Sequence, residues 1–184
     1  GVNIAFARRS FAIASSFGLA SVLSVIVLGD ESGYELGDVQ RVKLAAVEAE
    51  WETHEAPAPF TVFGLPNEET ETTDFALRIP WAMGIIATRS LDEEVTGLKD
   101  HKEAHRQRIV DGLIAYNLLD EMRRGDATPE QAALFEEHAG DIGYARLLEP
   151  FATDMANPSE QAIANAVDYS IPPVAPLFWS FRIM

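Results

Sequence analysis

The uncharged segment from Phe11 to Gly29 is the feature that most limits how this chain can fold. Its 19 residues, FAIASSFGLASVLSVIVLG, contain no charged side chain. A helix of that length rises roughly 28 Å, which is close to the thickness of the hydrocarbon core of a bilayer. Small and large residues are interleaved along it, as suits close packing between helices in lipid. The sequence therefore predicts a transmembrane helix in residues 1–29.

Two other interpretations of this segment stay open. Arg8 and Arg9 precede the segment, as they would in a secretory signal, but no small-residue cleavage site closes it and the run ends in Gly29-Asp30-Glu31. The other alternative is a helix buried inside a purely soluble acidic domain. Because the chain begins at Gly1 without an initiator Met and stops at Met184 within an apolar run, we expect it to be a piece of a longer protein.

The distribution of charge orients the predicted helix. Arg8 and Arg9 lie before it, whereas acidic side chains follow from Asp30 onward, so the positive-inside tendency places residues 30–170 outside the cytoplasm, on the periplasmic face in a bacterium. With 29 acidic against 14 basic residues, the net charge is −15, which disfavours nucleic acid as a partner. The sequence contains no Cys, which excludes disulfides, thiolate metal sites and Cys nucleophiles.

The remaining sequence predicts a mainly α fold with a possible small β-hairpin. Residues 29–38 are rich in Gly and predict turns, and Asp38 is placed to cap a helix that runs to about Trp51. Two β-rich segments, 60–63 and 75–79, predict the hairpin. The apolar residues 79–88 are too few to span a membrane and are expected in the core or at the membrane surface.

The second half of the chain is expected to be helical. Apolar spacing predicts a helix over 97–124 that stops at Gly125, and the capping box from Thr128 to Gln131 starts another. A further helix is predicted to start at residues 157–160 and to end near Tyr169. Residues 171–184 carry three Pro followed by an aromatic apolar run, which indicates the start of a second transmembrane helix.

Three segments carry a resemblance to a known family. Residues 10–53 contain SFAIASSFGLASVLSVIVLGDESGYELGDVQRVKLAAVEAEWET, residues 79–90 read IPWAMGIIATRS, and residues 170–184 read SIPPVAPLFWSFRIM. Together they resemble subunit I of the cytochrome bd-type quinol oxidases, in its long-loop branch, across essentially the whole chain. The resemblance implies a transmembrane helix bundle that oxidises quinol on the outer face of the bacterial inner membrane, in the so-called Q-loop, and reduces oxygen to water.

The resemblance also implies partners and cofactors. The partners would be quinol, the remainder of subunit I, subunit II and membrane lipid. The cofactors would be a low-spin haem b, with Met184 as one axial ligand, and further haems b and d elsewhere in the complex. The second axial ligand, a histidine, would lie on a helix before Gly1, so we expect the chain alone to be inactive.

Two residues of VKLAAVEAE correspond to the family's quinol-site lysine and glutamate. The resemblance implies that Lys43 anchors a quinol oxygen and that Glu48 accepts its proton, a role suited to a carboxylate. On a regular helix, residues five apart point about 140° from each other, so both reach one ligand only from its flank or from an irregular helix. Without the resemblance, the two would be interpreted as surface charges.

Three further residues enter through the resemblance. Asp30 opens the loop at the membrane face and is a weaker candidate for binding the quinol, the alternative being a polar residue at a helix end. Arg182 would lie near the haem, where it favours the reduced form or pairs with a propionate; the alternative is a side chain that reaches to the interface. Met184 offers a thioether, which raises a haem potential. Tyr34 is interpreted as structural.

One pair of histidines, His101 and His105, has the spacing of two metal ligands on a helix. No third ligand accompanies them, and the surrounding KDHKEAHRQR is strongly polar, so a solvated helix face is the preferred interpretation. The competing hypothesis for the whole chain is a membrane-anchored extracytoplasmic binding or interaction domain without redox activity. It predicts Lys43 and Glu48 scattered on a solvated surface, whereas a quinol site predicts that they face a cavity.

Overall fold

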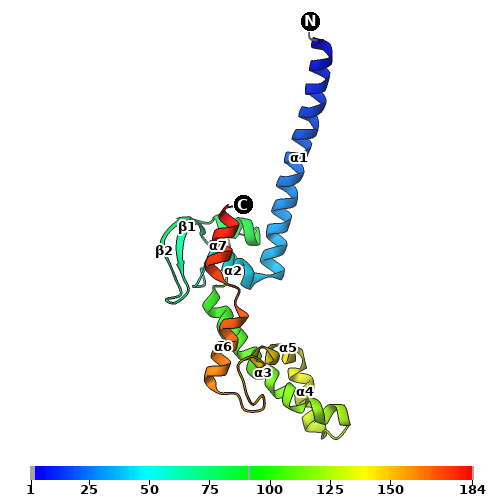
Figure 1. The fold of residues 1–184 in the computed structure, drawn as a ribbon, viewed down its shortest axis with the longest axis vertical. Coiled ribbons are helices and arrows are strands. Elements are labelled where there is room, and N and C mark those ends of the chain that lie inside the picture. The colour runs from blue at the N-terminus through cyan, green and yellow to red at the C-terminus, as the bar shows by residue number, and fades with distance from the viewer. Residues whose placement is uncertain (1–2, 91, 184) are drawn as a thin grey trace.

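A single long helix projects from a mostly helical body (Figure 1). The computed structural model describes residues 3–90 and 92–183. Helix α1, Ile4–Val39, has 36 residues and is long and apolar enough to cross a membrane over Ile4–Glu35. None of its apolar window is buried inside the chain, and Phe17 remains 72% exposed. That exposure contradicts the alternative of a core helix in a soluble domain, because a core helix is covered by its own chain.

Helix α1 continues past Gly29 to Val39, so the prediction of turns in residues 29–38 is wrong. The reason lies in tertiary contacts that sequence patterns do not reveal. The π-helical turn η1, Gly84–Thr88, packs against this part of α1, and Arg89 behind it pairs with Asp30 and Glu31. These contacts hold the Gly-rich segment in helical geometry despite the weak helix propensity of glycine.

Helix α2, Arg41–Glu48, follows after Gln40 and is shorter than predicted. Gln40, and not Asp38, is its N-cap residue, because Asp38 still belongs to α1. Ala49 adopts left-handed geometry at the C-terminus, and its N–H bonds back to the last turn. The helix therefore ends before Trp51, whose indole Nε1 donates to Thr73 Oγ1 at 3.2 Å.

The predicted hairpin is confirmed and is longer than expected. Strand β1, Phe60–Asn67, pairs antiparallel with β2, Thr72–Ile79. Beside this sheet lies helix α7, Val174–Ile183, which also packs on α2 and points toward the same side as the apolar part of α1 (Figure 1). Five residues are buried where α2 and α7 meet: Ala45, Ala46, Ala49, Val174 and Phe178.

The second half of the chain forms a separate helical layer. Helix α3, Leu98–Arg124, ends at Gly125 with φ 76°, as predicted. Three shorter elements, η2 (Ala139–Asp141), α5 (Ile142–Ala145) and α6 (Glu160–Ser170), pack on α3, and η3 (Arg146–Leu148) packs on α5 and α6. Helix α4, Pro129–His138, starts at the capping box of Thr128 and Gln131, as predicted.

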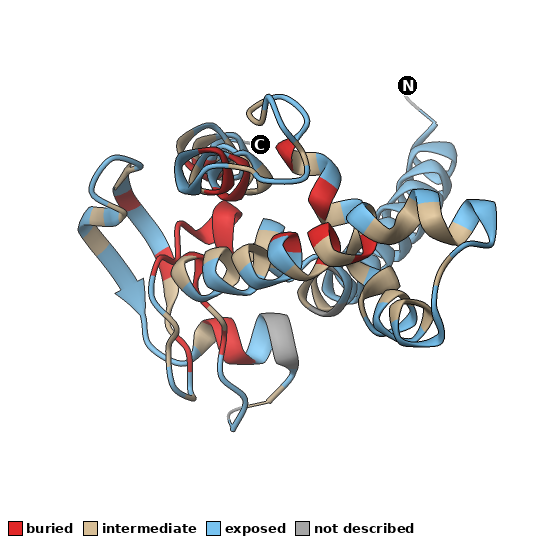
Figure 2. Ribbon diagram, turned by 90° about the horizontal axis from the view of Figure 1, so that it is seen from below, coloured by how far each residue is buried: buried red, intermediate tan, exposed pale blue. Residues whose placement is uncertain are grey.

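The buried side chains of this layer gather where α3, α5, η3 and α6 meet. They are Ile109, Leu113, Ala145, Leu148, Ala162, Ile163, Ala166 and Val167. The apolar part of α1, in contrast, is exposed (Figure 2). The predicted fold class, mainly α with one long apolar N-terminal helix and a small hairpin, is confirmed.

Candidate functional site

Arg182 of α7 binds the C-terminal end of α2 and the first strand. Its Nη2 donates to Glu48 Oε2 at 2.8 Å, and its Nη1 donates to the carbonyl oxygen of Val47 at 2.8 Å. Further hydrogen bonds from the same guanidinium reach the carbonyl oxygens of Thr61, Val62 and Phe178. The side chain is therefore anchored inside the chain, which contradicts the alternative in which it reaches outward to the membrane interface.

Glu48 is buried, with 3% of its surface exposed, and Arg182 is its ion-pair partner. Burial raises the pKa of Glu48 to about 7, although Arg182 acts in the opposite direction. Desolvation disfavours the charged form of a carboxyl group, so this side chain can exchange a proton near neutral pH. Glu48 thus has the acid–base property expected of a proton acceptor.

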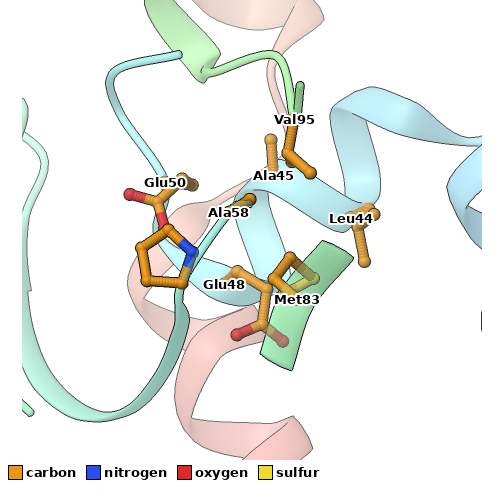
Figure 3. A pocket seen from close by; sticks show the side chains of 8 residues that line it. Leu44, Ala45, Glu48, Glu50, Ala58, Met83 and Val95 are labelled. Carbon is orange, nitrogen blue, oxygen red and sulfur yellow. The ribbon is translucent and has the colours of Figure 1, made fainter. Parts of the chain in front are cut away.

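A narrow recess beside Glu48 separates it from a second buried carboxyl group. Figure 3 shows the Glu48 carboxyl group next to Met83, with Leu44 and Glu50 on opposite sides of the recess. Burial raises the pKa of Glu50, against the lowering effects of His54 and Arg78. His54 Nε2 lies 2.7 Å from Glu50 Oε1, so each buried carboxyl group has its own cationic or hydrogen-bonding partner.

Lys43 does not share this recess with Glu48. It is exposed and lines a different and much larger groove of about 750 Å3 between α2, α3, α6 and α7. Lys43 makes no hydrogen bond or ion pair with any residue that the structure describes. The structure thus brings Glu48 and Arg182 together but leaves Lys43 apart from both, in agreement with the wide angle between positions 43 and 48 on a helix.

The groove that Lys43 lines has apolar walls, and its polar positions are basic or neutral. No Asp or Glu occurs among the described residues that line it, although the chain has twice as many acidic as basic residues. The lining residues are Val39, Gln40, Arg41, Val42, Lys43, His101, Ala104, His105, Arg108, Tyr144, Ser170, Pro172, Pro173 and Leu177. A groove of this volume, with apolar walls and a few convergent polar groups, has the character of a small-molecule site.

His101 and His105 line this groove, and the face of α3 that carries them is only partly exposed to solvent. Both side chains are half-buried. His105 Nδ1 lies 2.7 Å from Ser170 Oγ, and its ring meets the ring of Tyr144 edge-on. His101 Nε2 is buried without a hydrogen-bond partner among the described residues. Within the described ranges, 3–90 and 92–183, no group of three or more potential ligand side chains could hold a metal ion.

Asp30 lies in a third place, on the exposed surface of α1. Arg89 Nη2 contacts Asp30 Oδ2 at 2.8 Å and Glu31 Oε2 at 2.7 Å, and its guanidinium stacks 4.3 Å from the ring centre of Tyr34. Arg89 thus also links Tyr34 to the segment that follows η1. Asp30 is therefore engaged with the segment that follows η1, and it is not among the described residues that line the groove of Lys43 or the recess of Glu48.

Met184, the expected haem ligand, lies outside the described residues. The residues just before it are described: Phe181 is 52% exposed and Ile183 is 81% exposed. An apolar surface of this kind suits contact with a haem macrocycle or with lipid. The guanidinium of Arg182, in contrast, is occupied by Glu48 and by backbone carbonyl groups, which disfavours the expected pairing with a haem propionate in this arrangement.

Sequence reasoning missed the polar groups that accompany Lys43. Ser170, Tyr144 and His105 come from three different helices, and only the fold of the second half brings them to α2. The i, i+4 spacing of the two histidines was a usable signal, but the polar sequence around them indicated a solvated face. The absence of acidic side chains from the described lining of one groove could not be read from composition.

Comparison with known proteins gives one consistent result. The profile of the family described as cytochrome bd terminal oxidase subunit I matches residues 2–184. The cytochrome bd-II ubiquinol oxidase subunit 1 of Escherichia coli (strain K12) is 45% identical over 97% of this chain, which spans 35% of that protein. The cytochrome bd ubiquinol oxidase subunit 1 of Bacillus subtilis (strain 168) is 29% identical over 53% of the chain and 21% of that protein.

Solved structures match this chain as well. One of them is the bd oxidase from Geobacillus thermodenitrificans, at 24% identity and a TM-score of 0.37, and the match covers 87% of this chain and 36% of that one.

Proposed function

Because the chain belongs to the cytochrome bd terminal oxidase subunit I family, we propose that it is the quinol-oxidising part of a bacterial respiratory terminal oxidase. In this proposal α1 crosses the inner membrane, and residues 30–170 lie on the periplasmic side as the quinol-binding loop. The remainder of subunit I, subunit II and lipid surround it. Electrons leave the quinol for a low-spin haem b and finally reduce oxygen to water elsewhere in the complex.

The observation that carries this proposal is the groove beside Lys43. A quinol head group is a flat, largely apolar ring with two hydroxyl groups, so it requires apolar walls and polar groups at its ends. The groove supplies apolar walls from Val39, Val42 and Leu177, and the uncommitted ammonium group of Lys43 can donate to a ring oxygen. The recess beside Glu48 is too narrow for such a ring.

Glu48 takes a second role in the proposal. With a pKa of about 7 it can take up a proton near neutral pH, and its ion pair with Arg182 couples that protonation to the position of α7. Its burial behind α2 disfavours direct contact with a ligand held by Lys43 in this arrangement. Asp30 and Arg89 keep η1 against α1 at the membrane face, where a lipid-soluble quinol arrives.

A haem b fits the end of α7. Phe181 and Ile183 are exposed there, and Met184 would supply a thioether ligand, with the second axial ligand coming from elsewhere in subunit I. When bound, the haem would supply a one-electron acceptor for the quinol. In this proposal the oxygen-reducing site lies elsewhere in the complex, so activity belongs to the complete oxidase.

The experiment is quinol oxidase turnover of the complete oxidase that contains this chain, carrying Lys43→Ala or Glu48→Ala, with haem spectra of the same samples. We expect Lys43→Ala to reduce quinol turnover by at least about tenfold while the haem spectra stay intact. Unchanged turnover in both variants would contradict a quinol site on this loop and favour a binding domain without redox activity.

A further inference from the structure

We propose that His105 is the group that accepts the hydroxyl proton of a quinol bound in the Lys43 groove. This inference rests on the proposed function and assigns the general base of that site. The groove contains no carboxyl group among its described lining residues, and Glu48 lies on another side of α2. Among the described lining residues, His101 and His105 carry the side chains whose ordinary pKa lies nearest neutral pH, so an imidazole is the base best suited to act on a ligand in this groove.

The hydrogen bonds around His105 determine which of its nitrogens carries the proton. Ser170 Oγ donates its only hydrogen to the carbonyl oxygen of Val167, at 2.6 Å. Towards His105 Nδ1, at 2.7 Å, the same oxygen can then only accept, so Nδ1 carries the hydrogen. The neutral ring is left with an unprotonated Nε2, and it makes no hydrogen bond to any residue that the structure describes.

Catalytic histidines in other enzymes are held in the same way. A second side chain orients the imidazole through one nitrogen, and the other nitrogen is left free to react. His101 lacks such an orienting group. Its Nε2 is buried without a partner among the described residues, and nothing in the described ranges selects its tautomer. Of the two histidines in the groove, His105 is therefore the one that is held ready to accept a proton.

The charges that face His105 keep its ring neutral at neutral pH. His101 and Arg108 face it from α3, Tyr144 from α5, Ser170 from α6, and Lys43 and Arg41 from α2 across the groove. Burial lowers the pKa of His105, and His101 and Arg108 lower it further. Asp141, an acidic side chain at the start of α5, is already paired with Arg108 at 2.5 Å.

The step itself is a proton transfer coupled to loss of an electron. The O–H bond of the quinol hydroxyl breaks, its proton forms an N–H bond at Nε2, and the electron leaves for a one-electron acceptor of the complete oxidase. The products are a semiquinone and an imidazolium with both nitrogens protonated. Lys43 complements this step, because a cation stabilises the negative charge that grows on the ring oxygen. The unfavourable positive surroundings then promote release of the proton from the imidazolium to solvent.

The test compares three variants of the complete oxidase: His105→Gln, Ser170→Ala and, as a matched control, His138→Gln. His138 is a half-buried histidine at the end of α4, outside the groove. Turnover is measured with quinol over a range of pH, and also with a phenylenediamine donor, which gives up electrons without releasing a hydroxyl proton. Haem spectra of each sample report on the integrity of the complex.

We expect His105→Gln to reduce quinol turnover by about a hundredfold, in the range found for general bases, and to leave turnover with the phenylenediamine donor unchanged. The rise of quinol turnover with pH, which reports the neutral imidazole, should disappear. Ser170→Ala should give a smaller loss with the same donor selectivity, because it removes only the orientation of the ring. His138→Gln should match the unmodified oxidase.

The outcomes separate this inference from the proposed function. If Lys43→Ala abolishes quinol turnover and His105→Gln changes neither its rate nor its pH profile, the quinol site stands and His105 is not the base. If neither variant affects quinol turnover, the site itself is wrong. Equal losses with both donors in His105→Gln would indicate a structural role and would also overturn the inference.

Discussion

Arg182 Nη2 and Glu48 Oε2 lie 2.8 Å apart, although 134 positions separate the two residues in the chain. The contact joins the C-terminal end of α2 to α7, next to β1. Glu48 and Arg182 expose only 4% and 11% of their side chains. Both charged groups are therefore largely removed from water, and each is stabilised by the other. The guanidinium also stacks 3.6 Å from the ring centre of Phe178.

Loss of Arg182 should therefore destabilise the complete oxidase strongly. Arg182→Leu leaves a buried carboxyl group and several carbonyl groups without their hydrogen-bond donor. We expect the free energy of unfolding to fall by about 3 kcal/mol. The measurement is thermal unfolding of the purified complex. Arg146→Leu, which removes the exposed pair with Glu149, is the control and should change little. When Arg182→Leu is combined with Glu48→Leu, the free energy of unfolding should fall by less than the sum of the decreases caused by the two single substitutions.

The raised pKa of Glu48 predicts a pH dependence of stability. Its pKa is about 7 in the folded protein against 4.5 as the ordinary value, so the protonated form is favoured by folding. The stabilisation is complete below pH 4.5 and is lost as the pH rises through about 7, a change of about 3 kcal/mol.

We expect the melting temperature of the unmodified oxidase to fall, relative to that of Glu48→Gln, across that interval. A difference between the two proteins that stays constant with pH would show that Glu48 has an ordinary pKa. Glu50, whose pKa burial also raises, remains in both proteins and therefore cancels in the comparison.

Gly112 is required for the contact between α3 and α5. A Cβ atom at this position would lie 2.2 Å from the carbonyl oxygen of Asp141, which is backbone and cannot move aside cheaply. Gly112→Ala should lower the free energy of unfolding by about 2 kcal/mol, because an added methyl group in a well-packed core forces neighbouring atoms apart. Gly143→Ala, on α5, is the matched control because its Cβ would meet no atom within 4 Å. Equal thermal stability of the two variants would argue against this packing.

Arg89 should control the order of the segment that contains η1. Its ion pairs with Asp30 and Glu31 are exposed, so their contribution to global stability is small. Arg89→Ala should nevertheless increase amide hydrogen exchange in residues 84–90, because the pairs tie this segment to α1. Hydrogen exchange followed by mass spectrometry measures the effect, with Arg146→Ala as the control. Unchanged exchange at 84–90 would show that the apolar contacts of η1 suffice.

The sequence predicted the elements whose signals are local. The uncharged run, the capping box at Thr128 and the stop at Gly125 depend on neighbouring residues alone, and all three are present in the structure. The helical course of residues 29–38 was missed, because contacts with Arg89 and η1 outweigh the weak propensity of its glycines.

The candidate site was predicted in composition but not in arrangement. The spacing of positions 43 and 48 indicated that the two side chains diverge, and they line different cavities in the structure. The partnership of Glu48 with Arg182, and that of His105 with Ser170, join helices far apart in the chain. Such pairs follow from the tertiary fold, which a single sequence read by local patterns does not provide.

The central claim is that the quinol head group binds in the groove beside Lys43. Photolabelling of the complete oxidase with an azido-substituted quinone, followed by mass spectrometry of the labelled peptides, tests it most directly. The account predicts labels within residues 39–43, 101–108 and 170–177, and their loss when unmodified quinone competes. Labels confined to residues 58–63 and 81–86, around the recess of Glu48, would contradict it and place the quinol on the other side of α2.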